Sequence, residues 1–172
     1  RNCLALSQIH QRAGELEAGS ASPVVLLYAD TFTTFNEPGI GLAARRLLGA
    51  FGYRVELVRG DDAGRAAISV GMLDQAKRTA RRGLSELGRW LDRFEHAPLL
   101  VLEPSVLSAM IDDWALLKLD EHAPTLRALR ERASLVEDFL EARWDAHPRR
   151  PGFADSSGRV LFHGHCHQLA LL

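Results

Sequence analysis

Residues 163–168 read "HGHCHQ", a stretch that places three imidazoles and one thiol within five positions. Both groups bind zinc or iron, but a complete site needs three or four well-placed ligands. In a strand, His163, His165 and His167 would point to one side and Cys166 to the other, whereas a turn could bring them together. Two interpretations follow: metal ligands, or strand-end histidines held by hydrogen bonds beside a buried, inert cysteine.

Acidic residues follow two apolar runs earlier in the chain. Asp30 ends the run "VVLLYAD", where it either serves a function or caps the amide of Thr31 or Thr33. Asp61 and Asp62 stand in the loop that follows "YRVELV". Two adjacent carboxylates could bind a cation, although adjacent aspartates in a loop are more often simply solvated.

A third polar loop, "LEPSV", offers Glu103 and Ser105. Pro104 suits a turn, and Ser105 is expected to cap the helix that follows it. This structural role is favoured over a functional one. No serine or cysteine can be assigned a partner base from the sequence, so the chain shows no convincing nucleophile.

The elements that would position these loops alternate along the chain. Short apolar runs predict buried strands over 24–30, 53–58, 98–103 and 159–165. Apolar residues at helical spacing predict helices over 38–51, 73–94, from 104 onward, and over 125–144, where Ser134 could cap a second helix. This order predicts an α/β fold: a mainly parallel, roughly four-stranded sheet with helices on both faces, in a Rossmann-like three-layer arrangement. Ligands of such sheets bind beyond the carboxyl ends of the strands, where these loops would meet.

Composition limits the classes of function. A chain of 172 residues with 47% hydrophobic and 25% charged residues is typical of one soluble domain, and a net charge of −1 gives no reason to expect nucleic acid as a partner. No apolar run is long enough to span a membrane, and the first strand lacks a glycine-rich dinucleotide fingerprint. The two cysteines, Cys3 and Cys166, fit a reducing, cytoplasmic location. Because the chain begins at Arg1 and stops in "LALL", we expect it to be part of a longer protein.

Six segments together resemble a known family. They are "YADTFTTFNEPGIGLAARRLL", "GYRVELV", "AGRAAISVGMLDQAKRTARR", "VLEPSVL", "LVEDFL" and "GRVLFHGHCHQLAL". In this order and spacing they resemble the cysteine-rich CCG domain of iron–sulfur oxidoreductases. The resemblance is greatest to the iron–sulfur part of bacterial proteins fused to an FAD-linked oxidase, and the domain also occurs in glycolate oxidase iron–sulfur subunits.

The chain departs from this family at the cluster-binding positions. Where the family has Cys-Cys-Gly-Arg, the chain has Asp62, Ala63, Gly64 and Arg65, and the cysteine after Glu103-Pro104-Ser105 is replaced by Val106. Cys166 keeps its thiol. The family cysteines hold a [4Fe–4S] cluster, which normally takes about four thiolates. The resemblance therefore implies membership of the family with a degenerate cluster site.

The resemblance also implies an organisation and a set of partners. It implies that 23–158 form the CCG-like domain and 159–172 the start of a second repeat. Residues 1–22, which end in the loop-like "EAGSASP", are predicted from the sequence to form a short helix and linker. The partners would be an FAD-binding oxidase domain or subunit, the second CCG repeat and a membrane-peripheral electron acceptor. Electrons would pass from flavin after oxidation of a 2-hydroxy acid, with the protein in the cytoplasm or peripheral at the inner membrane. Two alternatives remain: a mononuclear metal site formed by Asp30, Asp62 and the histidines, and a purely structural interaction module.

Overall fold

The computed structural model describes residues 22–155 and 158–171, so the expected helix over 1–22 lies almost wholly outside the described residues. The described elements run in the order β1 (Val24–Ala29), α2 (Thr31–Phe35), α3 (Pro38–Ala50), β2 (Arg54–Arg59), α4 (Arg65–Ser69), α5 (Leu73–Arg93), β3 (Leu99–Val101), α6 (Pro104–Ser108), the π-helical η2 (Ala109–Asp113), α7 (Trp114–Leu116), the 3-10 helix η3 (Asp120–His122), α8 (Ala123–Arg132), β4 (Ala133–Leu135), α9 (Val136–Ala142) and α10 (Cys166–Leu171).

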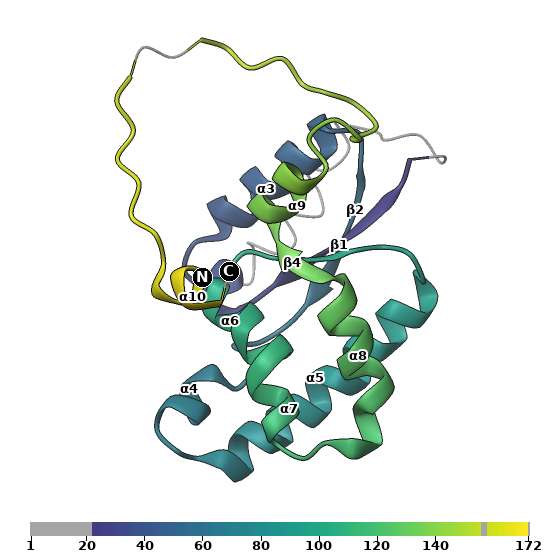
Figure 1. Cartoon of the computed structure of the whole chain (residues 1–172), viewed down its shortest axis with the longest axis vertical. Helices are drawn as coiled ribbons and strands as arrows, with labels where there is room; N and C mark the ends of the chain where they lie inside the picture. The colour runs from purple at the N-terminus through teal and green to yellow at the C-terminus, as the bar shows by residue number, and fades with distance from the viewer. Residues whose placement is uncertain (1–21, 156–157, 172) are drawn as a thin grey trace.

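The four described strands form one parallel sheet in the order β2-β1-β3-β4 (Figure 1). β1 is central and pairs with β2 along its whole length, with Val24 opposite Arg54. Its other edge pairs with β3, where Leu26 lies opposite Leu99. Parallel strands need helical crossovers, which cover both faces and explain why β1 carries apolar residues on both sides. The predicted α/β fold with a parallel sheet is confirmed.

Helices cover the two faces unequally. One face of the sheet packs against α5, α6, α7 and α8, and the buried cluster there includes Leu84, Leu87, Met110 and Trp114. The opposite face packs against α3 and α9, through residues such as Leu48 and Phe139. The apolar stripe predicted along 73–94 is therefore the core face of α5. Residues of β1 alternate between the two clusters, as the strand period requires.

The predicted fourth strand is wrong. Residues 158–165 form no strand, and the fourth strand is β4, which interrupts the helix predicted over 125–144. β4 pairs with β3, with Leu99 opposite Ala133. Ser134, expected to cap a helix, lies within β4, and α9 begins at Val136 without a side-chain cap.

Arg132 fixes the end of α8 at this point. Its guanidinium donates hydrogen bonds to the carbonyls of Ala97, Leu91 and Phe94. These bonds tie the end of α8 to the segment that leads into β3, so Ala133 continues alongside β3. Three residues with no marked strand pattern become a strand because of tertiary pairing, which overrides local propensity.

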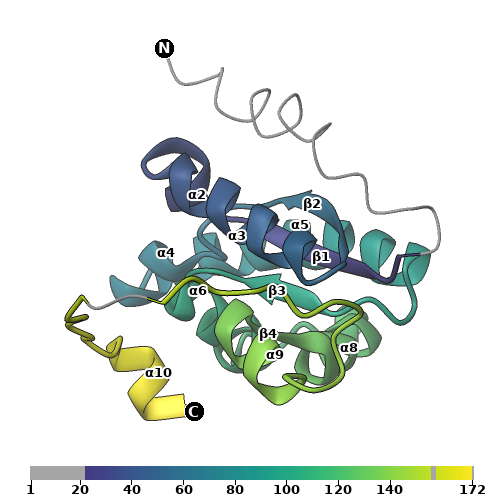
Figure 2. The same ribbon diagram turned by 90° about the horizontal axis from the view of Figure 1, so that it is seen from above.

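The carboxyl ends of the strands face one side of the molecule. Figure 2 shows α2, α4 and α10 on this side, and α2 and α4 follow the ends of β1 and β2. We call this side the carboxyl edge. Within the described part of the chain, no helix has both the length and the apolar character needed to cross a membrane.

Candidate functional site at the carboxyl edge

Asp30 is fully engaged as a helix cap. It is buried, its Oδ1 accepts a hydrogen bond from the Thr33 amide at 2.9 Å, and its Oδ2 accepts one from the Thr33 hydroxyl at 2.7 Å. Asp30 is the N-cap residue of α2. Of the two roles that the sequence left open, the structure shows the capping role, with Thr33 as the partner.

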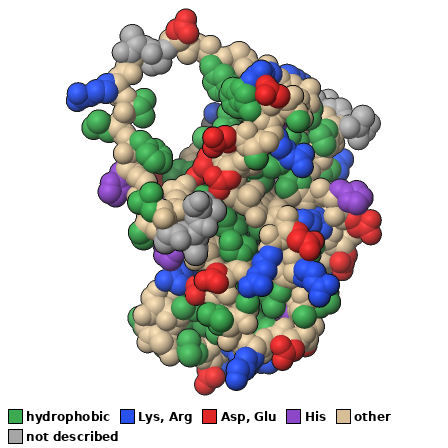
Figure 3. Space-filling view, in the orientation of Figure 1, with side chains coloured by type: hydrophobic (Ala, Val, Ile, Leu, Met, Phe, Trp, Pro, Cys, Tyr) green, Lys and Arg blue, Asp and Glu red, His purple; other side chains and the backbone are tan. Residues whose placement is uncertain are grey.

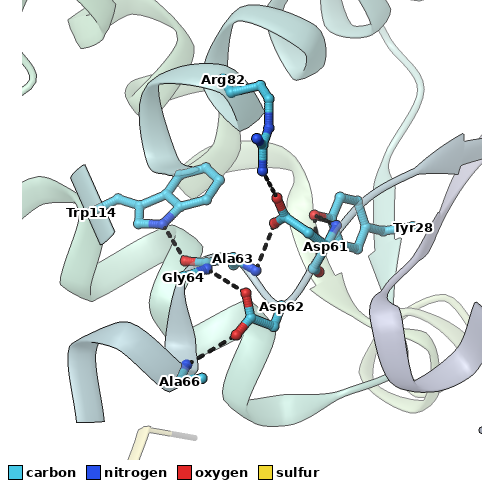
Figure 4. Close-up of polar contacts among 8 residues, drawn as sticks. All are labelled: Tyr28, Asp61, Asp62, Ala63, Gly64, Ala66, Arg82 and Trp114. Carbon is cyan, nitrogen blue, oxygen red and sulfur yellow. Dashed lines mark hydrogen bonds and ion pairs between the residues drawn. The ribbon is translucent and has the colours of Figure 1, made fainter. Parts of the chain in front are cut away.

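The loop after β2 is built around Asp62 (Figure 4). Its Oδ1 accepts from the Gly64 amide and its Oδ2 accepts from the Ala66 amide, each at 3.0 Å. Asp61 makes a similar turn, because its Oδ1 accepts from the Ala63 amide at 2.9 Å. Both Asp62 oxygens therefore satisfy amides at the start of α4, where orphan N–H groups need acceptors.

Ala63 and Gly64 give this loop an unusual backbone. Their φ angles are 54° and 74°, so two successive residues lie in the left-handed region. Such a φ is uncommon for alanine and is readily adopted by glycine. Ala63 is fully buried, and its carbonyl accepts a hydrogen bond from the indole of buried Trp114 at 2.8 Å. A Cβ on Gly64 would also lie only 3.3 Å from the Ala76 Cα, so the loop packs closely on α5.

Arg65 and Tyr28 attach the same loop to the body of the protein. Arg65 donates to the Asp113 carboxylate at 2.8 Å, which connects α4 to η2. The Tyr28 hydroxyl accepts from the Asp61 amide at 2.9 Å and donates to the Asp61 carbonyl at 3.3 Å. Burial, with a further contribution from the Asp61 carboxylate, raises the pKa of Tyr28, so the phenol stays protonated.

Glu103, and not Ser105, caps the helix after β3. The Glu103 Oε1 accepts from the Ser105 amide at 3.2 Å and from the Ser105 hydroxyl at 2.7 Å. The predicted capping role of Ser105 is therefore wrong, because its hydroxyl acts as a donor to the cap. Val106, where the resemblance would place a cysteine, is buried in the core cluster of this face.

The "HGHCHQ" stretch reaches the carboxyl edge as the start of α10. His165 Nε2 lies 3.6 Å from Glu103 Oε1, and Gln168 donates to Glu137 at 2.6 Å. His165 Nδ1 accepts from the His167 amide at 3.2 Å, so the neutral ring carries its proton on Nε2, toward Glu103. Cys166 is an exposed free thiol with its Sγ 4.0 Å from His165 Nδ1.

These groups do not converge on one ion. Glu103 and Cys166 lie at opposite nitrogens of the His165 ring, and His163 is exposed, with no hydrogen bond or ion pair to any described residue. Asp30 and Asp62 already use their oxygens as caps. Across residues 22–155 and 158–171, no three His, Cys, Asp or Glu side chains are grouped so that they could hold a metal ion.

The donors also do not fit a [4Fe–4S] cluster. The three positions at which the resemblance would place cysteines hold a capping carboxylate, a buried methyl group and a buried isopropyl group, at Asp62, Ala63 and Val106. The whole chain has two cysteines, whereas such a cluster takes about four thiolates. Cys3 lies outside the described residues. This chain by itself cannot supply the ligand set.

Sequence reasoning did not identify two residues that hold the site together, Tyr28 and Trp114. Each has a polar atom on a large apolar side chain, and such atoms usually find a partner when buried. Tyr28 stands inside a continuous apolar run, which is a usable signal that its hydroxyl bonds to a neighbouring loop. Nothing in the sequence around Trp114 indicates that its partner lies 51 residues earlier.

Comparison with known proteins gave no relative: no protein-family model, no curated protein and no solved structure matches this chain.

Proposed function

We propose that this chain is a CCG-like α/β domain of an FAD-linked iron–sulfur oxidoreductase in which the cluster loop has become a structural loop. The domain would serve as a scaffold for a flavin-binding oxidase domain and a second repeat, within a cytoplasmic or membrane-peripheral electron-transfer protein. The proposal starts from six segments of the sequence that resemble the CCG domain and occur in the same order. The observation that carries the scaffold role is the state of the 61–66 loop.

In that loop, the two positions where the family has cluster cysteines make structural hydrogen bonds within the protein. Asp62 binds two backbone amides, and Ala63 is buried and accepts from Trp114. Gly64, with its left-handed φ, and Arg65, with its ion pair to Asp113, are the two positions that match the family in sequence. These contacts support a structural role for the loop. On this proposal, the chain's own residues orient loops and present Cys166 at the carboxyl edge, and they carry out no bond-making step.

Iron and sulfide analysis of anaerobically purified protein tests the scaffold role. We expect far less than one cluster per chain and no broad iron–sulfur absorption. A matched variant, Asp62→Cys with Ala63→Cys and Val106→Cys, carries thiols at the three positions where the resemblance places family cysteines. Stoichiometric iron and sulfide in the unsubstituted chain would overturn the degenerate-site proposal. The family assignment has a separate test, since it predicts an FAD-binding domain and a further Cys-Cys-Gly motif in the flanking coding sequence.

A second candidate, an interaction module, is favoured by the segment before α10. Val160, Leu161 and Phe162 are 85%, 83% and 86% exposed. Figures 1 and 3 show this part of the chain arching away from the body, with hydrophobic side chains along it. Three successive exposed apolar residues are typical of a binding segment. Val160→Ser with Phe162→Ser would abolish partner binding in an interaction module and leave the fold unchanged, as judged by circular dichroism.

A further inference from the structure

A pocket with both charged and apolar residues in its lining, among them Tyr28 and Leu87, lies at the carboxyl edge between the end of β2 and α5. Its volume is about 190 Å³, and its lining includes Arg59, Gly60 and Asp61 from the strand end and Arg82, Gly83 and Glu86 from the helix. That is far more than one water molecule requires. Parallel α/β sheets bind small molecules at this position, beyond the carboxyl ends of the strands. Of the candidate ligand residues named from the sequence, Asp61 is the one that lines this pocket.

The walls of the pocket are fixed by aromatic side chains. A Cβ on Gly60 would lie 1.8 Å from the Tyr28 ring, and one on Gly83 would lie 3.0 Å from the Trp114 ring. Both positions therefore favour glycine, because the backbone passes directly against a buried ring. Tyr28 also binds the amide and the carbonyl of Asp61. The space is held open by packed residues and does not depend on an exposed loop.

The charges around the pocket are balanced but only half of them are paired. Arg82 donates to the Asp61 carboxylate at 2.8 Å, which neutralises one charge of each sign (Figure 4). Arg59 and Glu86 remain, and neither side chain makes a hydrogen bond or ion pair with any residue in the described part of the chain. Glu86 interacts with Arg82 only through the longer-range field. One cation and one anion, on two different elements, are thus left facing the same space.

This arrangement selects the charge type of a ligand. A simple anion would be attracted by Arg59 and repelled by Asp61 and Glu86, and a simple cation would face the reverse. A small zwitterion satisfies both leftover charges at once. We infer that the pocket binds a small α-amino acid, whose carboxylate accepts hydrogen bonds from the Arg59 guanidinium and whose ammonium donates to Glu86. A guanidinium fork matches a carboxylate with two parallel bonds.

NMR titration of the whole chain tests this inference, with L-alanine as the probe. We expect saturable shifts of the Gly60 and Gly83 amide signals with L-alanine, and none of that size with propionate or ethylammonium at equal concentration. Arg59→Gln and Glu86→Gln should each weaken the apparent affinity about tenfold or more, since each removes a charged hydrogen bond. Arg46→Gln on α3 and Glu131→Gln on α8, which are exposed and do not line the pocket, should leave the affinity unchanged.

Exchange of the two charges gives a second test, in which the expected result is a recovery of binding and not a loss of binding. The double variant Arg59→Glu with Glu86→Arg should recover binding that each single reversal abolishes, because a zwitterion can bind in the opposite direction. Equal shifts with propionate, together with no effect of Glu86→Gln, would show an anion site and overturn the inference. So would the absence of any shift at Gly60 and Gly83 with L-alanine at its highest soluble concentration.

Discussion

The loop at 61–66 and the segment at 159–168 both carry candidate ligand residues, but the first is tightly bonded into the protein and the second is largely exposed. In the first, the Asp62 oxygens, the Ala63 carbonyl and the Arg65 guanidinium all have partners within the protein. In the second, polar contacts from His165 to Glu103 and from Gln168 to Glu137 attach α10 to the rest of the described chain, and the side chains of Val160, Leu161 and Phe162 are more than 80% exposed. One is part of the core, and the other rests on its surface.

This difference predicts how each segment responds to substitution. At 61–66, the side chains make bonds that the fold needs, so the loop is expected to resist change and to contribute to global stability. At 159–168, the thiol of Cys166 stays exposed, and the chain around it carries little of the stability. The following substitutions test that contrast, from the largest expected effect to the smallest.

Trp114 should show the largest effect. Trp114→Ala removes a fully buried indole and should lower the free energy of unfolding by about 3–5 kcal/mol. Trp114→Phe keeps most of the apolar contact but leaves the Ala63 carbonyl without its donor, and should cost about 1–2 kcal/mol. Denaturant unfolding measures both. Trp144→Ala, at a side chain that is 43% exposed, is the control and should cost clearly less.

Asp62 should come next. Asp62→Ala leaves the Gly64 and Ala66 amides without acceptors and should cost about 1–2 kcal/mol. Asp62→Asn keeps one acceptor oxygen and should fall between the alanine variant and the unsubstituted protein. Asp155→Ala, at an exposed position, serves as the control in the same unfolding assay. If Asp62→Ala were as stable as that control, the loop would not be the structural element described here.

Tyr28 gives a smaller effect that depends on pH. Tyr28→Phe leaves the Asp61 amide without its partner and should cost about 1 kcal/mol. Burial raises the pKa of Tyr28 in the folded state, so its contribution is present below the unfolded pKa of about 10 and is lost as pH rises above it. Stability measured between about pH 9 and pH 11 should therefore fall less steeply in Tyr28→Phe. An unchanged slope would contradict the protonated, buried phenol.

Gln168 should affect only its own segment. Gln168→Ala removes the hydrogen bonds to Glu137 and to the His165 amide, and should speed amide exchange in α10 about fivefold, as loss of about 1 kcal/mol of local stability predicts. The midpoint of global unfolding should stay the same within error. His163→Ala, at an exposed histidine, is the matched control. A fall in global stability would show that α10 belongs to the core after all.

Much of the fold was predictable because its first three strands and longest helix depend on local apolar pattern. The runs at 24–30, 53–58 and 98–103 became β1, β2 and β3, and the stripe over 73–94 became α5. The fourth strand was not predictable in this way. "RVLF" has the stronger strand pattern, yet Ala133–Leu135 pairs with β3, because Arg132 bonds to the carbonyls before that strand.

In the candidate site, too, the sequence predicted some features and missed others. The pattern of apolar runs placed Asp30, Asp62 and Glu103 at or after strand ends, and the Asp30 cap was one of two predicted alternatives. His165 was predicted at the end of a strand that residues 158–165 do not form. The bonding partners of the site residues come from distant parts of the chain. Trp114 bonds to Ala63, Asp113 to Arg65 and Glu103 to His165. A hydrogen bond depends on distances of about 3 Å between atoms, and sequence spacing does not give those distances for residues on different elements.

By itself, the sequence determined the class of fold, the edge at which polar loops gather, and the number of thiols, because these follow from apolar periodicity, chain direction and composition. Only the tertiary structure decided which carboxylates are caps and which charges are left free. Asp62 and Glu86 are both acidic residues near the end of β2, but one is bonded to two amides and the other faces a pocket beside Arg59. The physical reason is that a charged group's role depends on its partners within a few ångströms, and folding alone brings those partners together.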